Sequence, residues 1–192
     1  MLFSFTKVVF ATLAFGVAAV SAIPTPAPAN AVAKHGGEDV LALLASVKAD
    51  VDVDIGKLNA LVAADVTLDV LGPIVADIKV KIDLATTTVK GYGPDQWQGD
   101  SANDISVSIN ALIVALIDPI NRIKGLNGDV TIINVFADID ISLGGLLNAI
   151  LALVSVDVSV NIKLNLVLIL APVVVILHGL DFTVLLNILA IL

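Results

Sequence analysis

The chain has 192 residues and a formal net charge of −8; 58% of its residues are hydrophobic and 4% are aromatic. A typical soluble domain is about 45–50% apolar even with glycine included, so the apolar character here comes mainly from Val, Ile, Leu and Ala. The acidic balance disfavours nucleic acid and anionic membrane surfaces as partners, since both need a basic footprint. The absence of cysteine excludes a disulfide scaffold, a thiol nucleophile and a cysteine-ligated zinc site.

Residues 1–22 have the three parts of an export signal. Lys7 supplies a positive charge, Val8 to Val20 form an apolar run, and small residues up to Ala22 provide a cleavage site. A membrane anchor is the alternative interpretation, but the run is short, and the flexible Pro-, Ala- and Gly-rich segment 23–37 follows it at once. We therefore predict a secreted protein, found outside the cell or in the cell wall.

Residues 38–90 form an acidic half that we expect to be helical. Apolar residues recur there at steps of three and four, which is the spacing of one helix face. Pro73 is placed to open a second helix, and Asp77–Lys81 and Lys79–Asp83 are predicted to form i,i+4 ion pairs. The first apolar stripe comprises Val40, Leu44, Val47, Val51, Ile55, Leu58 and Val62, and the second comprises Ile74, Ile78, Ile82, Ala85 and Val89.

The hexapeptide DVDVDI, Asp50 to Ile55, also fits two other patterns, an edge strand and a calcium loop. An EF-hand loop needs oxygen ligands at its first, third and fifth positions, glycine at the sixth and Glu at the twelfth. Asp50, Asp52 and Asp54 satisfy the first three, but Ile55 and Leu61 occupy the other two. We predict no metal site here, and a β-rich fold stays the alternative to the helical one.

Residues 91–103 have the glycine, proline and amide content of a loop, and residues 104–192 form a much more apolar half. Periodicity says little in a segment where nearly every position is hydrophobic. A wholly apolar helix must be buried in a bundle, in lipid or at another apolar interface. The charged residues from position 141 onwards are Asp157, Lys163 and Asp181.

The apolar half contains an internal similarity. The phrase DISVSI at residue 104 returns as DVSVNI 53 residues later, and Pro119 then matches Pro172. This pattern favours a repeat with units 104–139 and 140–192. We expect both prolines to open second helices. The glycines expected to end helices are Gly125, Gly128, Gly144, Gly145 and Gly179.

No residue pattern points to catalysis. His35 lies in the flexible segment, and His178 with Asp181 on a helix would form a buried polar pair, interpreted as structural because a working dyad also needs a nucleophile and an oxyanion site. Glycosidase-like carboxylate pairs are explained more simply as polar helix faces, and the chain has one glutamate, Glu38, and one tryptophan, Trp97. We predict no enzyme activity and no catalytic, cofactor or metal site.

A membrane-associated C-terminal region is an alternative. Leu164 to Leu180 is free of Asp, Glu, Lys and Arg over 17 residues, which is the lower limit for a spanning helix. Asn165 and Pro172 interrupt the run and make it a poorer span.

Two phrases suggest a family. The sequence LGPIVADIKVKIDLATTTVKG from Leu71, and the ending VVVILHGLDFTVLLNILAIL from Val173, lie in a hydrophilic first half and a hydrophobic second half. This layout resembles the small secreted structural proteins of mushroom-forming (basidiomycete) fungi. The resemblance implies a non-enzymatic protein of the cell wall and matrix that supports aerial hyphae and hyphal attachment.

Together these patterns predict an all-α bundle of amphipathic and apolar helices. The expected function is that of a secreted structural protein that self-associates or adsorbs at apolar interfaces, with cell-wall or matrix components as further partners. A membrane protein and a secreted lipid-binding module are the alternatives.

Overall fold

The computed structural model describes residues 37–92 and 102–190, which belong to one unit, residues 33–192. The predicted export signal, His35 and Trp97 lie outside the described residues. The α-helices in these ranges are α1 (Gly37–Ala60), α2 (Leu68–Gly91), α3 (Ala102–Leu126), α4 (Val130–Asn134), α5 (Ala137–Leu153), α6 (Val156–Leu170), α7 (Val174–Gly179) and α8 (Thr183–Leu189), and the 3₁₀ turns are η1 (Ala63–Asp65) and η2 (Ala171–Val173).

The all-α prediction is confirmed. The described ranges contain no β-strand, so the β-rich alternative is wrong for this part of the chain. The first predicted stripe is largely correct, although Ile55 is only partly buried, and Val62 lies beyond the end of α1 with 57% of its surface exposed. The stripe positions that are buried in α1 are Val40, Leu44, Val47, Val51 and Leu58.

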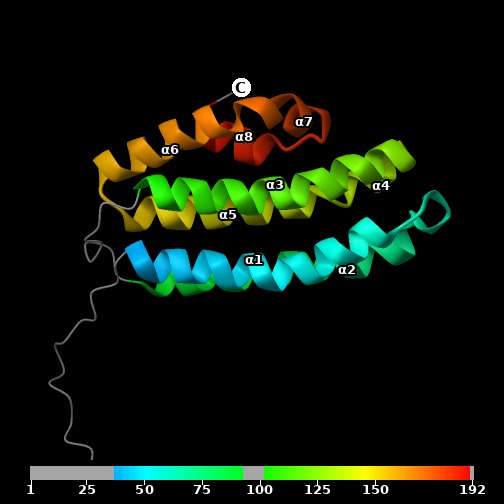
Figure 1. The fold of residues 1–192 in the computed structure, drawn as a ribbon, viewed down its shortest axis with the longest axis horizontal. Helices are drawn as coiled ribbons and strands as arrows, with labels where there is room; N and C mark the ends of the chain where they lie inside the picture. Colours follow the sequence, from blue (N-terminus) through cyan, green and yellow to red (C-terminus); the bar gives the residue numbers. More distant parts are fainter. Residues whose placement is uncertain (1–36, 93–101, 191–192) are drawn as a thin grey trace, which may run out of the picture. The chain divides into compact units, whose positions relative to one another are not determined.

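The helices of this unit pack in three layers (Figure 1). The acidic helices α1 and α2 lie side by side, α3 and α5 form the middle layer, and α6 to α8 form the third. Helix α1 packs on α3, α2 on α5, α3 on α6, and α5 on α8. The acidic half therefore covers one side of the middle layer, and α6 to α8 cover the other.

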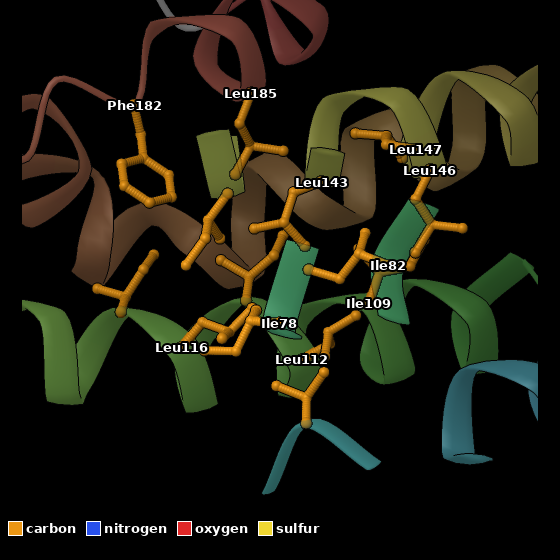
Figure 2. Packing of buried hydrophobic residues seen from close by; sticks show 14 of the residues in the cluster. Ile78, Ile82, Ile109, Leu112, Leu116, Leu143, Leu146, Leu147, Phe182 and Leu185 are labelled. Atoms are coloured by element: carbon orange, nitrogen blue, oxygen red, sulfur yellow. The ribbon is translucent and has the colours of Figure 1, made fainter. Parts of the chain in front are cut away.

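The core lies where these layers meet. Figure 2 shows aliphatic side chains of α2, α3 and α5 interdigitating, with side chains of the C-terminal segment closing the cluster. Ile78 and Ile82 of α2, Leu116 of α3 and Phe182 before α8 are almost wholly buried. Each such side chain contributes roughly 1.5–3 kcal/mol to the burial free energy, so an aliphatic core of this size holds the layers together without disulfides.

Two of the predictions about proline are wrong. Helix α2 begins at Leu68, so Pro73 lies inside it, and Pro119 lies buried inside α3. Of these three prolines, Pro172 is the one that lies between two helices, in the 3₁₀ turn η2 that separates α6 from α7. A proline within a helix removes one backbone hydrogen bond. Around Pro119 this cost is offset because α3 buries a long apolar face on both sides of it.

The glycine predictions hold near Gly125 and Gly179, where α3 and α7 end, and are wrong for Gly144 and Gly145, which lie inside α5. Gly144 serves a close approach of α5 and α8 instead. A Cβ there would lie 2.6 Å from Cγ1 of Val184 in α8, which is closer than carbon atoms pack.

The proposed repeat is not confirmed and stays a prediction. Asp104 and Asp157 do lie in the first turns of α3 and α6, where a carboxylate is stabilised by the helix dipole. Beyond those turns the two units differ, since α3 continues through Pro119 and α6 ends before Pro172.

Candidate functional site

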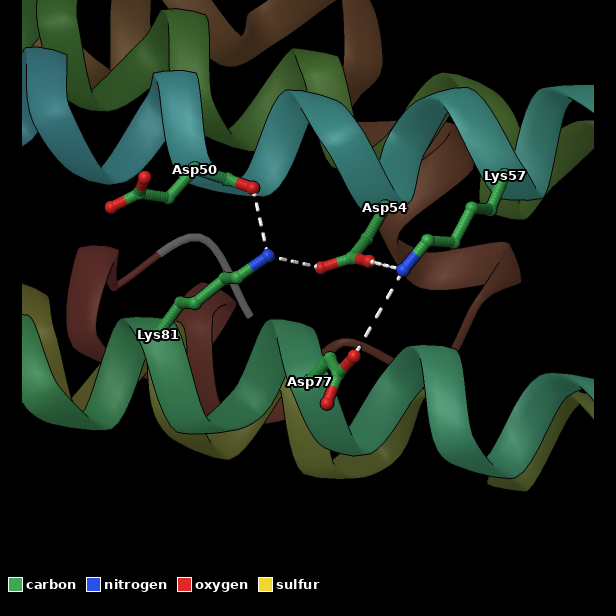
Figure 3. Close-up of polar contacts among 5 residues, drawn as sticks. All are labelled: Asp50, Asp54, Lys57, Asp77 and Lys81. Atoms are coloured by element: carbon green, nitrogen blue, oxygen red, sulfur yellow. Dashed lines mark hydrogen bonds and ion pairs between the residues drawn. The ribbon is translucent and has the colours of Figure 1, made fainter.

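A cluster of polar contacts joins α1 to α2 and includes Asp50 and Asp54 of the DVDVDI hexapeptide (Figure 3). The carboxylate of Asp54 has no exposed surface; its Oδ1 lies 2.6 Å from Nζ of Lys57 and its Oδ2 lies 2.5 Å from Nζ of Lys81. Lys81 also donates to the backbone carbonyl of Asp50 at 2.8 Å. Nζ of Lys57 lies 3.9 Å from Oδ2 of Asp77.

The Asp54 cluster has the electrostatics of a structural link. Burial alone would raise the pKa of Asp54, but the hydrogen bonds and charges of Lys57 and Lys81 outweigh it and hold that pKa below its usual range. The pKa of Lys57 is raised, chiefly by its hydrogen bond to Asp54. Both carboxylate oxygens accept hydrogen bonds from lysine ammonium groups and are buried, so the cluster has the character of a structural contact between α1 and α2.

This geometry decides two predictions about the polar helix faces. The Asp77–Lys81 pair is wrong because Lys81 points across to α1, whereas the Lys79–Asp83 pair is confirmed at 2.6 Å. Asp52, the middle acid of the hexapeptide, lies away from Asp54 and pairs with Lys48 at 2.8 Å. Across residues 37–92 and 102–190, no group of three or more His, Asp or Glu side chains is placed to hold a metal ion.

The structure does not bring His178 and Asp181 together as a buried pair. Helix α7 ends at Gly179, both side chains are exposed, and Asp181 has a positive φ of 61°. The contact between these two residues is a backbone one, from the amide of Asp181 to the carbonyl of His178 at 3.2 Å. The predicted buried dyad is therefore wrong.

A buried carboxylate that the sequence did not single out is Asp140 of α5. Its two oxygens accept the backbone N–H groups of Val184 at 2.8 Å and Leu185 at 2.9 Å, which caps the start of α8. Burial raises the pKa of Asp140, against the lowering effect of these two hydrogen bonds. Asp140 therefore fastens α8 to α5 beside the Gly144 contact.

Helix α6 has apolar residues on two opposite faces. Ile162, Leu166 and Leu170 are fully buried and face the rest of the bundle. A second series is offset from the first by two residues, or about 200° around a helix, and points outward. Its exposed fractions are 79% for Val156, 49% for Val160, 56% for Leu164 and 74% for Leu168, and Val175 of α7 is 79% exposed. We call the four exposed residues of α6, Val156, Val160, Leu164 and Leu168, the outer α6 face.

The outer α6 face is poor in charge. From Val156 to Gly179 the formal charges are those of Asp157 and Lys163 alone. Clustered exposed aliphatic side chains on a folded domain mark an interaction surface, whereas singly scattered ones do not. This face is therefore the candidate functional site.

Three described segments are long and apolar enough to cross a membrane by length and composition. They differ in how much of their most apolar 18-residue window is buried: 50% for Ala102–Leu126, 50% for Val130–Leu153 and 22% for Val156–Gly179. The last is also the most apolar of the three. The most hydrophobic segment is thus the one whose side chains the fold protects least.

Sequence reasoning placed residues 104–192 at an apolar interface but did not identify the outer α6 face. The signal was the alternation in VDVSVNIKLNLVL from Val156. On a helix, apolar residues at every second position fall into two series on opposite sides, and only one can face the bundle.

The sequence matches no known protein-family model and has no significant match among curated proteins. The function of the chain must therefore be argued from its own residues.

Proposed function

We propose that this protein is a secreted, non-enzymatic structural protein of the fungal cell wall or extracellular matrix that adsorbs to apolar interfaces through its outer α6 face. The observation that carries the proposal is the exposure of Val156–Gly179, the most apolar of the three long segments and the least buried. The resemblance to small secreted structural proteins of mushroom-forming fungi is the basis for the proposed location.

Charge asymmetry supports a preferred orientation at such an interface. From Gly37 to Gly91 the chain carries nine acidic and five basic residues, whereas from Val156 to Ala190 it carries two acidic residues and one basic residue. The two segments lie on opposite sides of the middle layer. The acidic layer therefore keeps contact with water while the outer α6 face meets air, oil or an apolar wall surface.

The exposed side chains of the outer α6 face supply a driving force for adsorption that does not require unfolding. Full burial of a large aliphatic side chain is worth roughly 1.5–3 kcal/mol. Leu164 and Leu168, which are 56% and 74% exposed, can together contribute about 2–4 kcal/mol when they leave water. Val156 and Val160 raise the total to roughly 4–8 kcal/mol, which is comparable to the lower part of the roughly 4–15 kcal/mol cost of immobilising a molecule.

The proposal is tested with the purified mature protein by drop tensiometry at an oil–water interface. The double variant Leu164→Gln/Leu168→Gln removes two residues of the outer α6 face. The matched control Val80→Gln/Leu84→Gln removes two aliphatic residues that are 64% and 67% exposed at the same spacing on α2.

We expect the α6 variant to need a protein concentration at least tenfold higher for the same drop in interfacial tension, as the loss of about 2–4 kcal/mol implies, and the α2 control to behave as the wild type. Equal losses in the two variants, or none in either, would contradict the proposal. Circular dichroism verifies that both variants remain helical.

A membrane protein is the second candidate, favoured by the three segments of spanning length. The two candidates differ in extraction. An integral protein fractionates with membranes and is released from them by detergent and not by dilute alkali or salt, whereas a secreted surface protein partitions into the medium, the cell wall or foam.

A further inference from the structure

A groove lies between the C-terminal ends of α2 and α5. Its volume is about 470 Å³, within the roughly 300–1,000 Å³ range of small-molecule sites. Its apolar lining residues are Gly145, Ala149, Ala152 and Leu153 of α5 and Val89 of α2.

The groove exists because α5 carries small side chains along one stripe. Positions 145, 149 and 152 follow each other at steps of four and three, so they share one helix face. The first carries no Cβ, and one added there would meet nothing closer than Cγ2 of Thr86 at 4.0 Å. Neighbouring positions such as Leu146 and Ile150 are large and buried. The result is an apolar trough along this face of α5.

The polar groups that border the trough are Lys90, Tyr92 and Asn148. The described lining thus includes one cation and no carboxylate, in a chain with 18 acidic and 10 basic residues. An apolar trough with a cation and an amide at its border is complementary to an alkyl chain that ends in an anionic group.

We propose that this groove binds one anionic single-chain amphiphile of the fatty-acid class. The alkyl chain lies along Gly145, Ala149 and Ala152, and the carboxylate faces Lys90 and Asn148. The groove shares no residue with the outer α6 face: its lining belongs to α2, to Tyr92 directly after α2, and to α5.

The test is isothermal titration calorimetry of the mature protein with dodecanoate and with dodecyltrimethylammonium, both below their micelle concentrations. We expect dodecanoate to saturate at one molecule per chain and the cationic amphiphile to bind at least roughly tenfold more weakly. Absence of saturable dodecanoate binding, or equal affinity for the two amphiphiles, would overturn the proposal.

Three variants locate the site. Ala152→Leu and Ala149→Leu fill the trough, and each is expected to weaken dodecanoate binding at least roughly tenfold, as loss of the alkyl contact implies. Ala152 is exposed, so its variant is the one least able to disturb the core. Lys90→Gln should weaken the binding of dodecanoate and narrow the difference in affinity between the two amphiphiles, because it removes the one cation of the described lining. Trough variants that bind dodecanoate as well as the wild type would overturn the proposal.

The double variant Leu164→Gln/Leu168→Gln separates this site from the proposed function. It should bind dodecanoate as the wild type does, even though its adsorption to oil is reduced. Loss of dodecanoate binding in this variant alone would place the amphiphile on α6 and would overturn the groove assignment.

Discussion

Replacing two adjacent glycines of α5 by alanine should change stability in opposite directions. A Cβ at Gly144 would lie 2.6 Å from Cγ1 of Val184 and 3.1 Å from Cδ1 of Ile188, whereas carbon atoms pack at about 3.5–4.0 Å. Val184 is β-branched and stiff about χ1, so α8 must move away from α5. At Gly145 the new Cβ would meet only Thr86, at 4.0 Å.

The magnitudes follow from these distances. Alanine in place of glycine inside a helix gains roughly 1 kcal/mol, and overpacking of a tight contact costs about 1–3 kcal/mol. Gly145→Ala should therefore stabilise the protein by about 1 kcal/mol, and Gly144→Ala should destabilise it by up to about 2 kcal/mol.

Thermal unfolding followed by circular dichroism measures the difference. At about 2–4 °C for each kcal/mol in a domain of this size, Gly145→Ala should melt roughly 3–10 °C above Gly144→Ala. Equal melting temperatures, or the reverse order, would refute the close approach of α8 to α5 at Gly144.

Three further substitutions test the polar contacts, each by urea unfolding. Asp54→Asn should cost about 1–3 kcal/mol at neutral pH, since it weakens the bonds to two lysines that are themselves partly exposed; the lowered pKa of Asp54 means that its contribution is present above the usual carboxyl range and lost as pH falls through the lowered value. Asp140→Asn should remove a pH dependence of the opposite direction. The raised pKa of Asp140 contributes stability at low pH that is lost as pH rises through that raised value. A wild-type pH profile unchanged by either substitution would contradict the assignment. Arg122→Met should cost about 1 kcal/mol, because Nη2 of Arg122 donates to the carbonyl of Leu61 at 2.7 Å; an unchanged midpoint would show that water replaces this bond.

The helical fold of the acidic half could be predicted because its stripes hold a helical period over many turns. In the hexapeptide DVDVDI, helical periodicity predicts which valine is buried but not that Asp54 is buried. Val51 is buried and Val53 is 63% exposed, as a helix requires. The side chain of Asp54, by contrast, is fully buried. Lys81, which lies 27 residues further along the chain, donates a hydrogen bond to its carboxylate. A contact that distant leaves no local pattern in the sequence.

Alternation of apolar and polar residues was the strongest argument for strands, and the structure gives it another meaning. In α2, Ile78 and Ile82 are buried while Val80 and Leu84 are exposed, and in α6 the same division holds. Period-two alternation on a helix marks two apolar faces rather than one. Pro73 and Pro119 were wrongly predicted to open helices, because burial of the surrounding helix outweighs the local cost of a missing backbone hydrogen bond.

The outer α6 face, and not the acidic layer, is the surface that we propose to meet an apolar interface. The chain has no cysteine, so a single introduced cysteine can carry an environment-sensitive fluorophore at a chosen site. Leu168→Cys on α6 and Leu84→Cys on α2 are matched, since the native side chains are 74% and 67% exposed. On adsorption to an oil-in-water emulsion, we predict a blue-shifted, quencher-protected emission at position 168 and an unchanged emission at position 84. Equal shifts at the two positions, or a shift at position 84 alone, would contradict the claim.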